Sequence, residues 1–171
     1  LDPAATGLLV VVLGKFTKLS QKFSGEDKIY TGTILLGTET DSQDMDGTVT
    51  RQADWSGVTE DALRKAFASL EGDIMQTPPM VSAVKKDGAR LYELARKGKE
   101  VERDAKPVTI HYIKVDKVYL PYADFTVRCS KGTYVRTICS DVGGMLGCGA
   151  ALLKLNRVCS GGFDLADAVT V

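Results

Sequence analysis

The sequence predicts a single domain built from both strands and helices. The chain has 171 residues, which is enough for one domain with a hydrophobic core. Some segments alternate apolar and polar residues with the period of a strand, and others repeat apolar residues at helical spacing. Hydrophobic residues make up 44% of the chain and charged residues 26%, as in a water-soluble globular protein. No apolar run approaches the roughly 20 residues of a membrane span, and no signal peptide is visible, so we expect no membrane association.

Several segments carry strand patterns. Residues 8–13 form a continuous, valine-rich apolar run that ends at Gly14, which predicts a fully buried strand. Residues 29–36 alternate, with Tyr30 and Ile34 on one face, and predict a second strand. Farther along, two strand-like stretches are joined by a short turn, which predicts a hairpin, and one more strand follows. These last three segments are residues 109–120, 124–129 and 150–158.

Three segments carry the apolar spacing of helices. The clearest spans residues 59–70, because Thr59 can cap it and its apolar residues form one stripe. A shorter helix is expected over residues 15–23, with its lysines facing solvent. A third helix begins after Gly132 and ends at Gly147, a residue type that commonly ends helices.

The sequence does not indicate a metal or nucleotide site. The acidic loop at residues 37–47 looks like a calcium loop, but with Gly47 in the central position the closing glutamate would fall on Ala53. The four cysteines lack Cys-x-x-Cys pairing and His111 is the only histidine, so we expect buried thiols and not a zinc site, and assign His111 no function. The glycine-rich stretch at residues 143–149 ends a helix, whereas phosphate loops precede one. We therefore expect no cofactor and no metal.

Two stretches carry recognisable motifs. The first is LDPAATGLL at residues 1–9, followed by GKFTK at residues 14–18. The second is CSKGTYVRTI at residues 129–138. Both closely resemble the motifs of the TruB family of tRNA pseudouridine synthases, and the resemblance extends over essentially the whole chain, from Leu1 to about Thr170.

The resemblance implies the pseudouridine synthase catalytic fold. This is an α+β domain with a mixed, largely antiparallel sheet, flanking helices and an active cleft across the middle of the sheet. It implies one catalytic domain over residues 1–171, with a basic, RNA-clasping insertion at about residues 78–106. Compared with the family, we expect this chain to lack the upstream part of the sheet and a C-terminal RNA-binding PUA domain.

The resemblance also implies roles for five residues. Asp2 would be the catalytic nucleophile and Arg136 would hold it ionised. Tyr30 would stack on the target base and help to move its proton, while Tyr134 and Leu155 would line the base pocket. From the residues alone, an ordinary Asp-Pro turn explains Asp2 better, and plain core packing explains Tyr30 and Leu155 better.

Arg136 is singled out by its position as well. It falls in the first turn of the predicted third helix, where the helix dipole disfavours a cation, so we expect an anion beside it. Asp2 is the partner that the resemblance implies, because an arginine fork can hold a carboxylate with two hydrogen bonds and lower its pKa. Other carboxylates could serve Arg136 equally well, and a simple surface arginine is a further alternative.

Basic residues concentrate in the second half of the chain. Residues 1–76 hold 7 basic and 12 acidic residues, a net charge of −5, and residues 77–171 hold 15 and 10, a net charge of +5. Sequence halves intermingle in a folded chain, so chance segregation is an alternative. Residues 80–106 resemble a family insertion that folds over RNA, although a solvated amphipathic helix at residues 91–97 would explain the same charges. The residues expected to contact RNA are Lys85, Arg90, Tyr92 and Lys131.

The function that the resemblance implies is isomerisation of a uridine to pseudouridine in the T-loop of tRNA, at position 55. The partner would be the tRNA T-stem-loop, and we expect a monomer in the cytoplasm, or in an organelle stroma or matrix if a transit peptide lies upstream. One alternative is a non-catalytic tRNA-binding or RNA-folding module. Another is an H/ACA-type enzyme that works with guide RNA, but Ala5-Thr6-Gly7 and the insertion favour the stand-alone branch.

Overall fold

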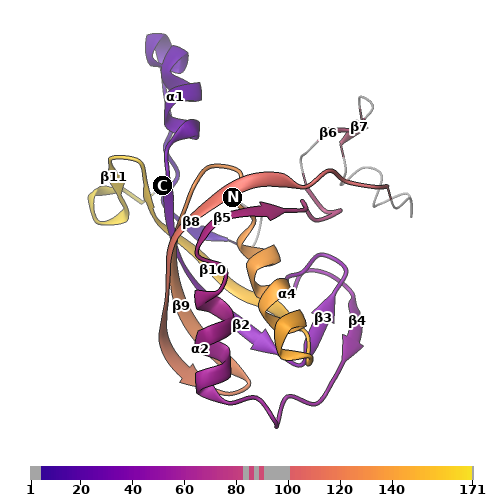
Figure 1. Cartoon of the computed structure of the whole chain (residues 1–171). Helices are drawn as coiled ribbons and strands as arrows, with labels where there is room; N and C mark the ends of the chain where they lie inside the picture. The colour runs from indigo at the N-terminus through magenta and orange to yellow at the C-terminus, as the bar shows by residue number, and fades with distance from the viewer. Residues whose placement is uncertain (1–4, 83–84, 87–88, 91–100, 171) are drawn as a thin grey trace.

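The computed structural model of the chain describes residues 5–82, 85–86, 89–90 and 101–170. Its main sheet contains β1 (Thr6–Gly7), β2 (Lys28–Leu36), β5 (Gly72–Gln76), β8 (Lys106–Tyr119), β9 (Tyr122–Cys129), β10 (Ala150–Ser160) and β11 (Phe163–Asp164). The strands lie in the order β1-β10-β2-β9-β8-β5, with β11 paired to β10 (Figure 1). All pairings are antiparallel except that of β1 with β10. The predicted mixed, largely antiparallel sheet is therefore confirmed.

Two small sheets, three α-helices and two 3-10 helices complete the described part of the chain. β3 (Thr38–Thr40) pairs with β4 (Val49–Gln52), and β6 (Lys85–Lys86) pairs with β7 (Ala89–Arg90). The helices are η1 (Gly14–Leu19), α1 (Ser20–Gly25), α2 (Glu60–Ala68), α4 (Val135–Leu146) and η2 (Leu165–Asp167), where η marks a 3-10 helix. α2 and α4 pack on the sheet, while α1 projects from the end farthest from α2 (Figure 1). None of the described helices is long and apolar enough to cross a membrane.

The hydrophobic core lies between the sheet and the helices α2 and α4. Thr59 caps α2 as expected, because its hydroxyl accepts a hydrogen bond from the N–H of Ala62 at 3.2 Å. Leu63 and Phe67 of α2 are fully buried, and the Phe67 ring lies 5.1 Å from the ring of Phe125 in β9. Burying one such side chain stabilises the fold by roughly 1.5–3 kcal/mol. The predicted apolar stripe of this helix is confirmed.

The second motif covers the last residue of β9, the turn before α4 and the first turn of that helix. Ile138 and Val142 point into the core, and the helix ends at Gly147, whose φ of 78° is the left-handed value that glycine adopts most readily. The predicted hairpin is β8 with β9, and the predicted last strand is β10. All three predictions are confirmed, with strand ends that differ slightly from those expected.

The prediction of a buried strand over residues 8–13 is wrong. In this part of the chain only Thr6, Gly7 and Leu8 bond to β10, and the chain leaves the sheet after Leu8. Leu9, Val11 and Leu13 are 66%, 67% and 75% exposed. An apolar run indicates which residues could be buried, but a strand also needs a neighbour, and beyond Leu8 none of the described residues pairs with this run as a strand.

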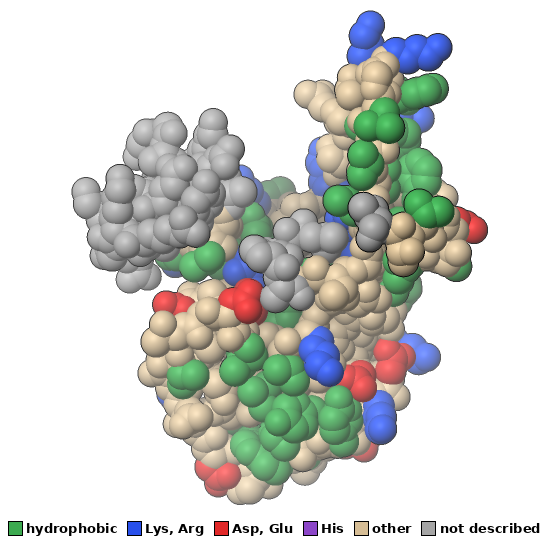
Figure 2. All heavy atoms as spheres, turned by 180° about the vertical axis from the view of Figure 1, so that it is seen from behind, with side chains coloured by type: hydrophobic (Ala, Val, Ile, Leu, Met, Phe, Trp, Pro, Cys, Tyr) green, Lys and Arg blue, Asp and Glu red, His purple; other side chains and the backbone are tan. Residues whose placement is uncertain are grey.

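Residues 9–25, which we call the arm, project from the body of the protein. Figure 2 shows the arm from behind, with apolar and basic side chains along it. Its helices η1 and α1 confirm the short helical segment, and its lysines are exposed as expected. At its base, the ammonium of Lys28 donates to the carbonyls of Ser24 (2.7 Å) and Glu26 (2.5 Å). Burial, reinforced by nearby Arg157, lowers the pKa of Lys28.

Candidate active site

The first motif is anchored along β10 from its sixth residue onward, whereas Asp2 lies outside the described residues. The N–H of Leu8 donates to the carbonyl of Arg157 at 2.8 Å, and the Arg157 Nε donates back to the carbonyl of Leu8 at 2.7 Å. Gly7 has a φ of 99°, and a Cβ there would lie 2.3 Å from the Arg157 carbonyl oxygen. Glycine is therefore required where the motif passes β10. This contact fixes the chain a few residues after Asp2.

Tyr30 and Leu155 lie on one face of the sheet. A bulge between Leu152 and Lys154 shifts the register of β10, so that Leu152 and Leu155 both share the face of β2 that carries Tyr30 and its alternate neighbours. Both predicted pocket residues are half-buried and pack against the core. This packing also agrees with a plain core role, so their contact with a base stays a prediction.

A small pocket brings the first motif, the acidic loop and β10 together. It has a volume of about 40 Å³, and Ala5, Asp44 and Leu155 are among its lining residues. Ala5 is the first described residue of the chain. The pocket therefore joins the predicted base-lining leucine to the segment that follows Asp2.

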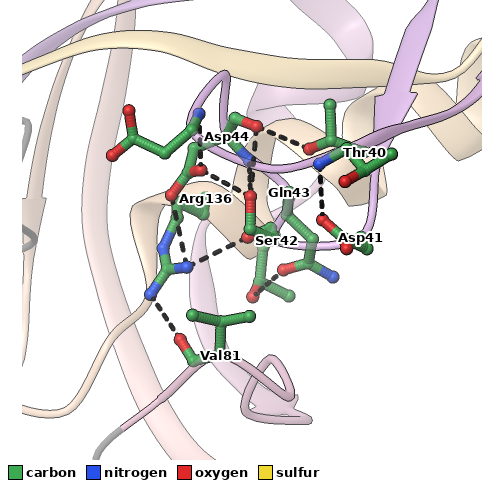
Figure 3. A network of polar contacts seen from close by, with 10 residues as sticks. Thr40, Asp41, Ser42, Gln43, Asp44, Val81 and Arg136 are labelled. Carbon is green, nitrogen blue, oxygen red and sulfur yellow. Dashed lines mark hydrogen bonds and ion pairs between the residues drawn. The ribbon is translucent and has the colours of Figure 1, made fainter. Parts of the chain in front are cut away.

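Arg136 is buried and is held by two separate segments. Its Nη1 donates to the carbonyl of Ser42 at 3.0 Å and lies 3.3 Å from the Oδ2 of Asp44, while its Nη2 donates to the carbonyl of Val81 at 3.0 Å (Figure 3). The guanidinium therefore bridges the acidic loop and the first residues of the insertion. The surface-arginine alternative is wrong, since only 3% of the residue is exposed.

Asp44 is the acidic residue that the structure places beside Arg136, and its role was not predicted. Its Oδ1 accepts hydrogen bonds from the hydroxyl of Ser42 at 2.5 Å and from the N–H of Asp46 at 3.1 Å. An anion beside Arg136 was expected from the helix dipole, and Asp44 supplies one. The predicted pairing of Arg136 with Asp2 lies outside the described residues and stays a prediction.

The acidic loop is fixed against both β10 and α4. The N–H of Met45 donates to the carbonyl of Leu152 at 3.2 Å, and the N–H of Leu152 donates to the carbonyl of Gln43 at 3.0 Å. The Gln43 side chain accepts from the hydroxyl of Thr137 at 2.8 Å, next to Arg136 (Figure 3). The loop thus forms a scaffold for the start of α4. The expected turn-rich loop is confirmed over residues 41–47, whereas residues 38–40 form β3, and the docking of the loop was not foreseen.

Tyr134 begins α4 and is held by a residue that the sequence did not single out. The backbone N–H of Tyr134 donates to the Oε1 of Gln76 at 2.7 Å, and the Nε2 of Gln76 donates to the carbonyl of Tyr134 at 3.0 Å. Gln76 is the last residue of β5, a strand that the sequence patterns did not predict. Tyr134 itself is half-buried.

The residues expected to contact RNA are only partly described. The backbones of Lys85 and Arg90 are partners in the register of β6 with β7, and Lys131 is exposed in the turn before α4. Tyr92 and the alternative helix at residues 91–97 lie outside the described residues. The two ends of the insertion are joined, because Arg103 donates to the carbonyl of Pro78 at 3.2 Å.

Within the described part of the chain, no group of three or more His, Cys, Asp or Glu residues is placed to hold a metal ion. All four cysteines are free, and three of them are buried as expected. Burial raises the pKa of Cys129 to about 11, so its thiol stays protonated at neutral pH. A protonated thiol is a poor metal ligand and a poor nucleophile.

Comparison with protein-family models gives two adjoining matches. Residues 1–135 match the TruB family pseudouridylate synthase N-terminal domain, and residues 136–171 match the tRNA pseudouridylate synthase B C-terminal domain. The tRNA pseudouridine synthase B of Opitutus terrae is 50% identical over all 171 residues, which span 71% of that protein. The enzyme of the same name from Geotalea uraniireducens is 47% identical, and this chain spans 55% of its length.

Solved structures agree with the family models. A chain in the crystal structure of a Cbf5-Nop10-Gar1 complex has a TM-score of 0.72 and 28% identity, and the match covers 96% of this chain and 39% of that one. A chain in an archaeal box H/ACA Nop10-Cbf5 complex, at 23% identity and a TM-score of 0.65, shows the same fold. On these grounds the chain belongs to the TruB family of pseudouridine synthases.

Proposed function

We propose that this protein isomerises a uridine to pseudouridine in the T-loop of tRNA, at position 55. Relatives named tRNA pseudouridine synthase B that are 50% and 47% identical over the whole chain support the reaction and the substrate. The observation in the structure that carries the proposal is the buried Arg136, fixed at the start of α4 beside Asp44, which lines a small pocket together with Ala5 of the first motif. A cation fixed in this way is suited to orient a reactive carboxylate.

Asp2 is the carboxylate that we assign to this role. It lies three residues before Ala5, so its Cα is within about 11 Å of that of Ala5. Ala5 and Asp44 line the same small pocket, and Asp44 contacts Arg136. These contacts support a pairing of Asp2 with the guanidinium, which would lower the pKa of its carboxyl and keep it ionised as a nucleophile.

The chemistry requires the target base to leave the stack of the T-loop before the carboxylate can act. The bond between N1 and C1′ breaks, a bond between C5 and C1′ forms, the proton on C5 is released, and N1 takes up a proton. Tyr30 would stack on the base and help to move the C5 proton. Tyr134 and Leu155 would line the base pocket, and Lys85, Arg90, Tyr92 and Lys131 would contact the RNA.

The test is tritium release from a T-stem-loop RNA that carries 5-tritiated uridine, with the full chain and no guide RNA. We expect Asp2→Asn to lower the release rate by about a thousandfold or more, because the nucleophile is lost. RNA binding should stay close to that of the wild type. Asp61→Asn, at an exposed site on α2, is the matched control and should release tritium normally. Undiminished release by Asp2→Asn would rule out its role as nucleophile.

The same assay separates the two alternative functions. A non-catalytic tRNA-binding module would bind the T-stem-loop and never release tritium. The second alternative is a guide-dependent enzyme, and the fold likeness to Cbf5 is the reason to test it. Such an enzyme would release tritium only when a guide RNA is added. We expect release from naked tRNA.

A further inference from the structure

We propose that Gln76 is a positioning residue that fixes the start of α4 and thereby the orientation of Tyr134 and Arg136. This inference rests on the proposed function, because its catalytic readout is tritium release. In this proposal Gln76 acts through the backbone of Tyr134 and not on the reacting atoms. It is therefore a positioning residue and not a catalytic one.

The contact between Gln76 and Tyr134 is reciprocal and buried. One side-chain amide accepts from the N–H of Tyr134 at 2.7 Å and donates to its carbonyl at 3.0 Å. Only 3% of Gln76 is exposed, so water cannot replace these bonds. A planar amide supplies one donor and one acceptor side by side, which is the pattern that a neighbouring strand would offer. The side chain thus extends the pairing of the sheet by one residue.

Tyr134 determines where the first turn of α4 begins. It is the N-cap of α4, and no side chain within the motif caps the helix. The carbonyl of Tyr134 also accepts from the N–H groups of Thr137 (3.1 Å) and Ile138 (3.3 Å), which form the first turn. Gln76 therefore fixes the group from which the first turn is built. Arg136 follows two residues later.

The orientation of that first turn matters because the guanidinium of Arg136 must meet two segments at once. Its partners are the carbonyls of Ser42 and Val81 and the carboxylate of Asp44. A small rotation of the helix start would break some of these contacts. A displacement on the order of 1 Å in a catalytic group can cost about a hundredfold in rate.

The route of the chain explains why a side chain is used here. β5 pairs with β8 as far as Gln76, and Pro78 and Pro79 follow, both fully buried. Prolines have no N–H and cannot extend the ladder. After the prolines, the next described contact of this segment with the second motif is the hydrogen bond from the guanidinium of Arg136 to the carbonyl of Val81. Gln76 and Val81 hold the motif on either side of the two prolines.

The test compares Gln76→Met with Gln52→Met, a matched change at an exposed glutamine of β4. Met has nearly the volume of Gln but neither bonds to the Tyr134 backbone. With saturating T-stem-loop RNA, we expect kcat per folded molecule to fall roughly tenfold to a hundredfold in Gln76→Met, while the Kd for RNA changes little. Gln52→Met should match the wild type. A merely structural role would reduce the folded fraction and leave kcat per folded molecule unchanged, and that result would overturn the proposal.

Gln76→Glu gives a readout that depends on the protonation state. A protonated carboxyl has a donor and an acceptor, like the amide, whereas the carboxylate can only accept and would repel the Tyr134 carbonyl. Burial raises the pKa of such a carboxyl, so lowering the pH should protonate it and restore both bonds. The ratio of the Gln76→Glu rate to the wild-type rate should therefore rise as the pH is lowered from about 8.5 to about 5.5. The ratio for Gln76→Met should stay flat. A flat ratio for Gln76→Glu contradicts the proposed pair of bonds.

Hydrogen exchange separates this proposal from the proposed function. In Gln76→Met the amide of Tyr134 should exchange faster than in the wild type and in Gln52→Met. If the wild type releases no tritium, the proposed function fails, yet the exchange of Tyr134 still decides whether Gln76 holds the start of α4. Unchanged exchange would overturn the proposal whatever the activity.

Discussion

Two arginine–aspartate pairs in this protein have similar separations and different surroundings. Arg136 lies 3.3 Å from Asp44, with side chains that are 4% and 14% exposed. Arg128 of β9 lies 3.0 Å from Asp27, with side chains that are 48% and 35% exposed. The exposed pair is the shorter one, yet water screens it, whereas the buried pair has lost its hydration. Distance alone therefore does not rank the two pairs.

The difference lies in what else each arginine touches. Arg136 donates to backbone carbonyls of two separate segments, so the cost of burying its charge is offset by several hydrogen bonds (Figure 3). Asp27 instead shares one oxygen between Arg128 and His111, each at 3.0 Å. We conclude that the buried pair organises the candidate active site, and that the exposed pair only adds to the surface of the sheet.

The largest effect is expected when each arginine is replaced by Met. Arg136→Met leaves the largely buried Asp44 without its ion-pair partner, which should lower the free energy of unfolding by about 3–5 kcal/mol. Arg128→Met should lower it by less than about 1 kcal/mol, since its pair is exposed. Chemical denaturation of the two variants and the wild type measures both. Equal losses would remove the distinction between the pairs.

A double-mutant cycle isolates each pair from its surroundings. Combining Arg136→Met with Asp44→Asn should give a coupling energy of about 1–3 kcal/mol, because the two groups are in direct buried contact. The cycle of Arg128→Met with Asp27→Asn should give less than about 1 kcal/mol. Denaturant titrations of the six variants and the wild type supply the values. A larger coupling for the exposed pair would reverse our ranking.

The smallest effect is expected from acid. Partial burial works to raise the pKa of Asp27, but hydrogen bonds from Arg128 and His111 outweigh it and hold this pKa below its usual 3.8. The folded state then binds a proton less readily than the unfolded state, so the contribution is present above pH 3.8 and is lost as the pH falls through the lower folded pKa.

Asp27→Asn removes this contribution, so stability should fall slightly less than in the wild type between about pH 5 and about pH 3. Urea midpoints at the two pH values measure the difference. A steeper acid loss in the variant would show that Asp27 is not held by its partners. The effect is small because the pair is solvated.

The parts of the fold that follow from local patterns were predictable. The cap at Thr59, the stripe through Leu63 and Phe67, and the stop at Gly147 all depend on residues a few positions apart. The run at residues 8–13 misled because hydrophobicity does not reveal whether a neighbour is present. β5 was missed because its few residues show no clear alternation and their strand character comes from pairing with β8.

The candidate site was predictable where motifs mark it and not where distant residues support it. The helix dipole correctly predicted an anion beside Arg136. Asp44 is brought there by a loop that Arg136 contacts at Ser42, 94 residues away in the sequence. The bonds between Gln76 and Tyr134 span 58 residues. No local pattern reports contacts of this kind, because they depend on how the sheet and α4 are assembled.

We propose that the buried Arg136 orients the chemistry while Arg128 does not, and one comparison of tritium release tests this difference. Arg136→Lys keeps the charge but loses the planar fork that reaches two segments, so its release rate on naked T-stem-loop RNA should fall about a hundredfold or more with RNA binding little changed. Arg128→Lys should release tritium at the wild-type rate. Equal rates in the two variants would contradict the claim.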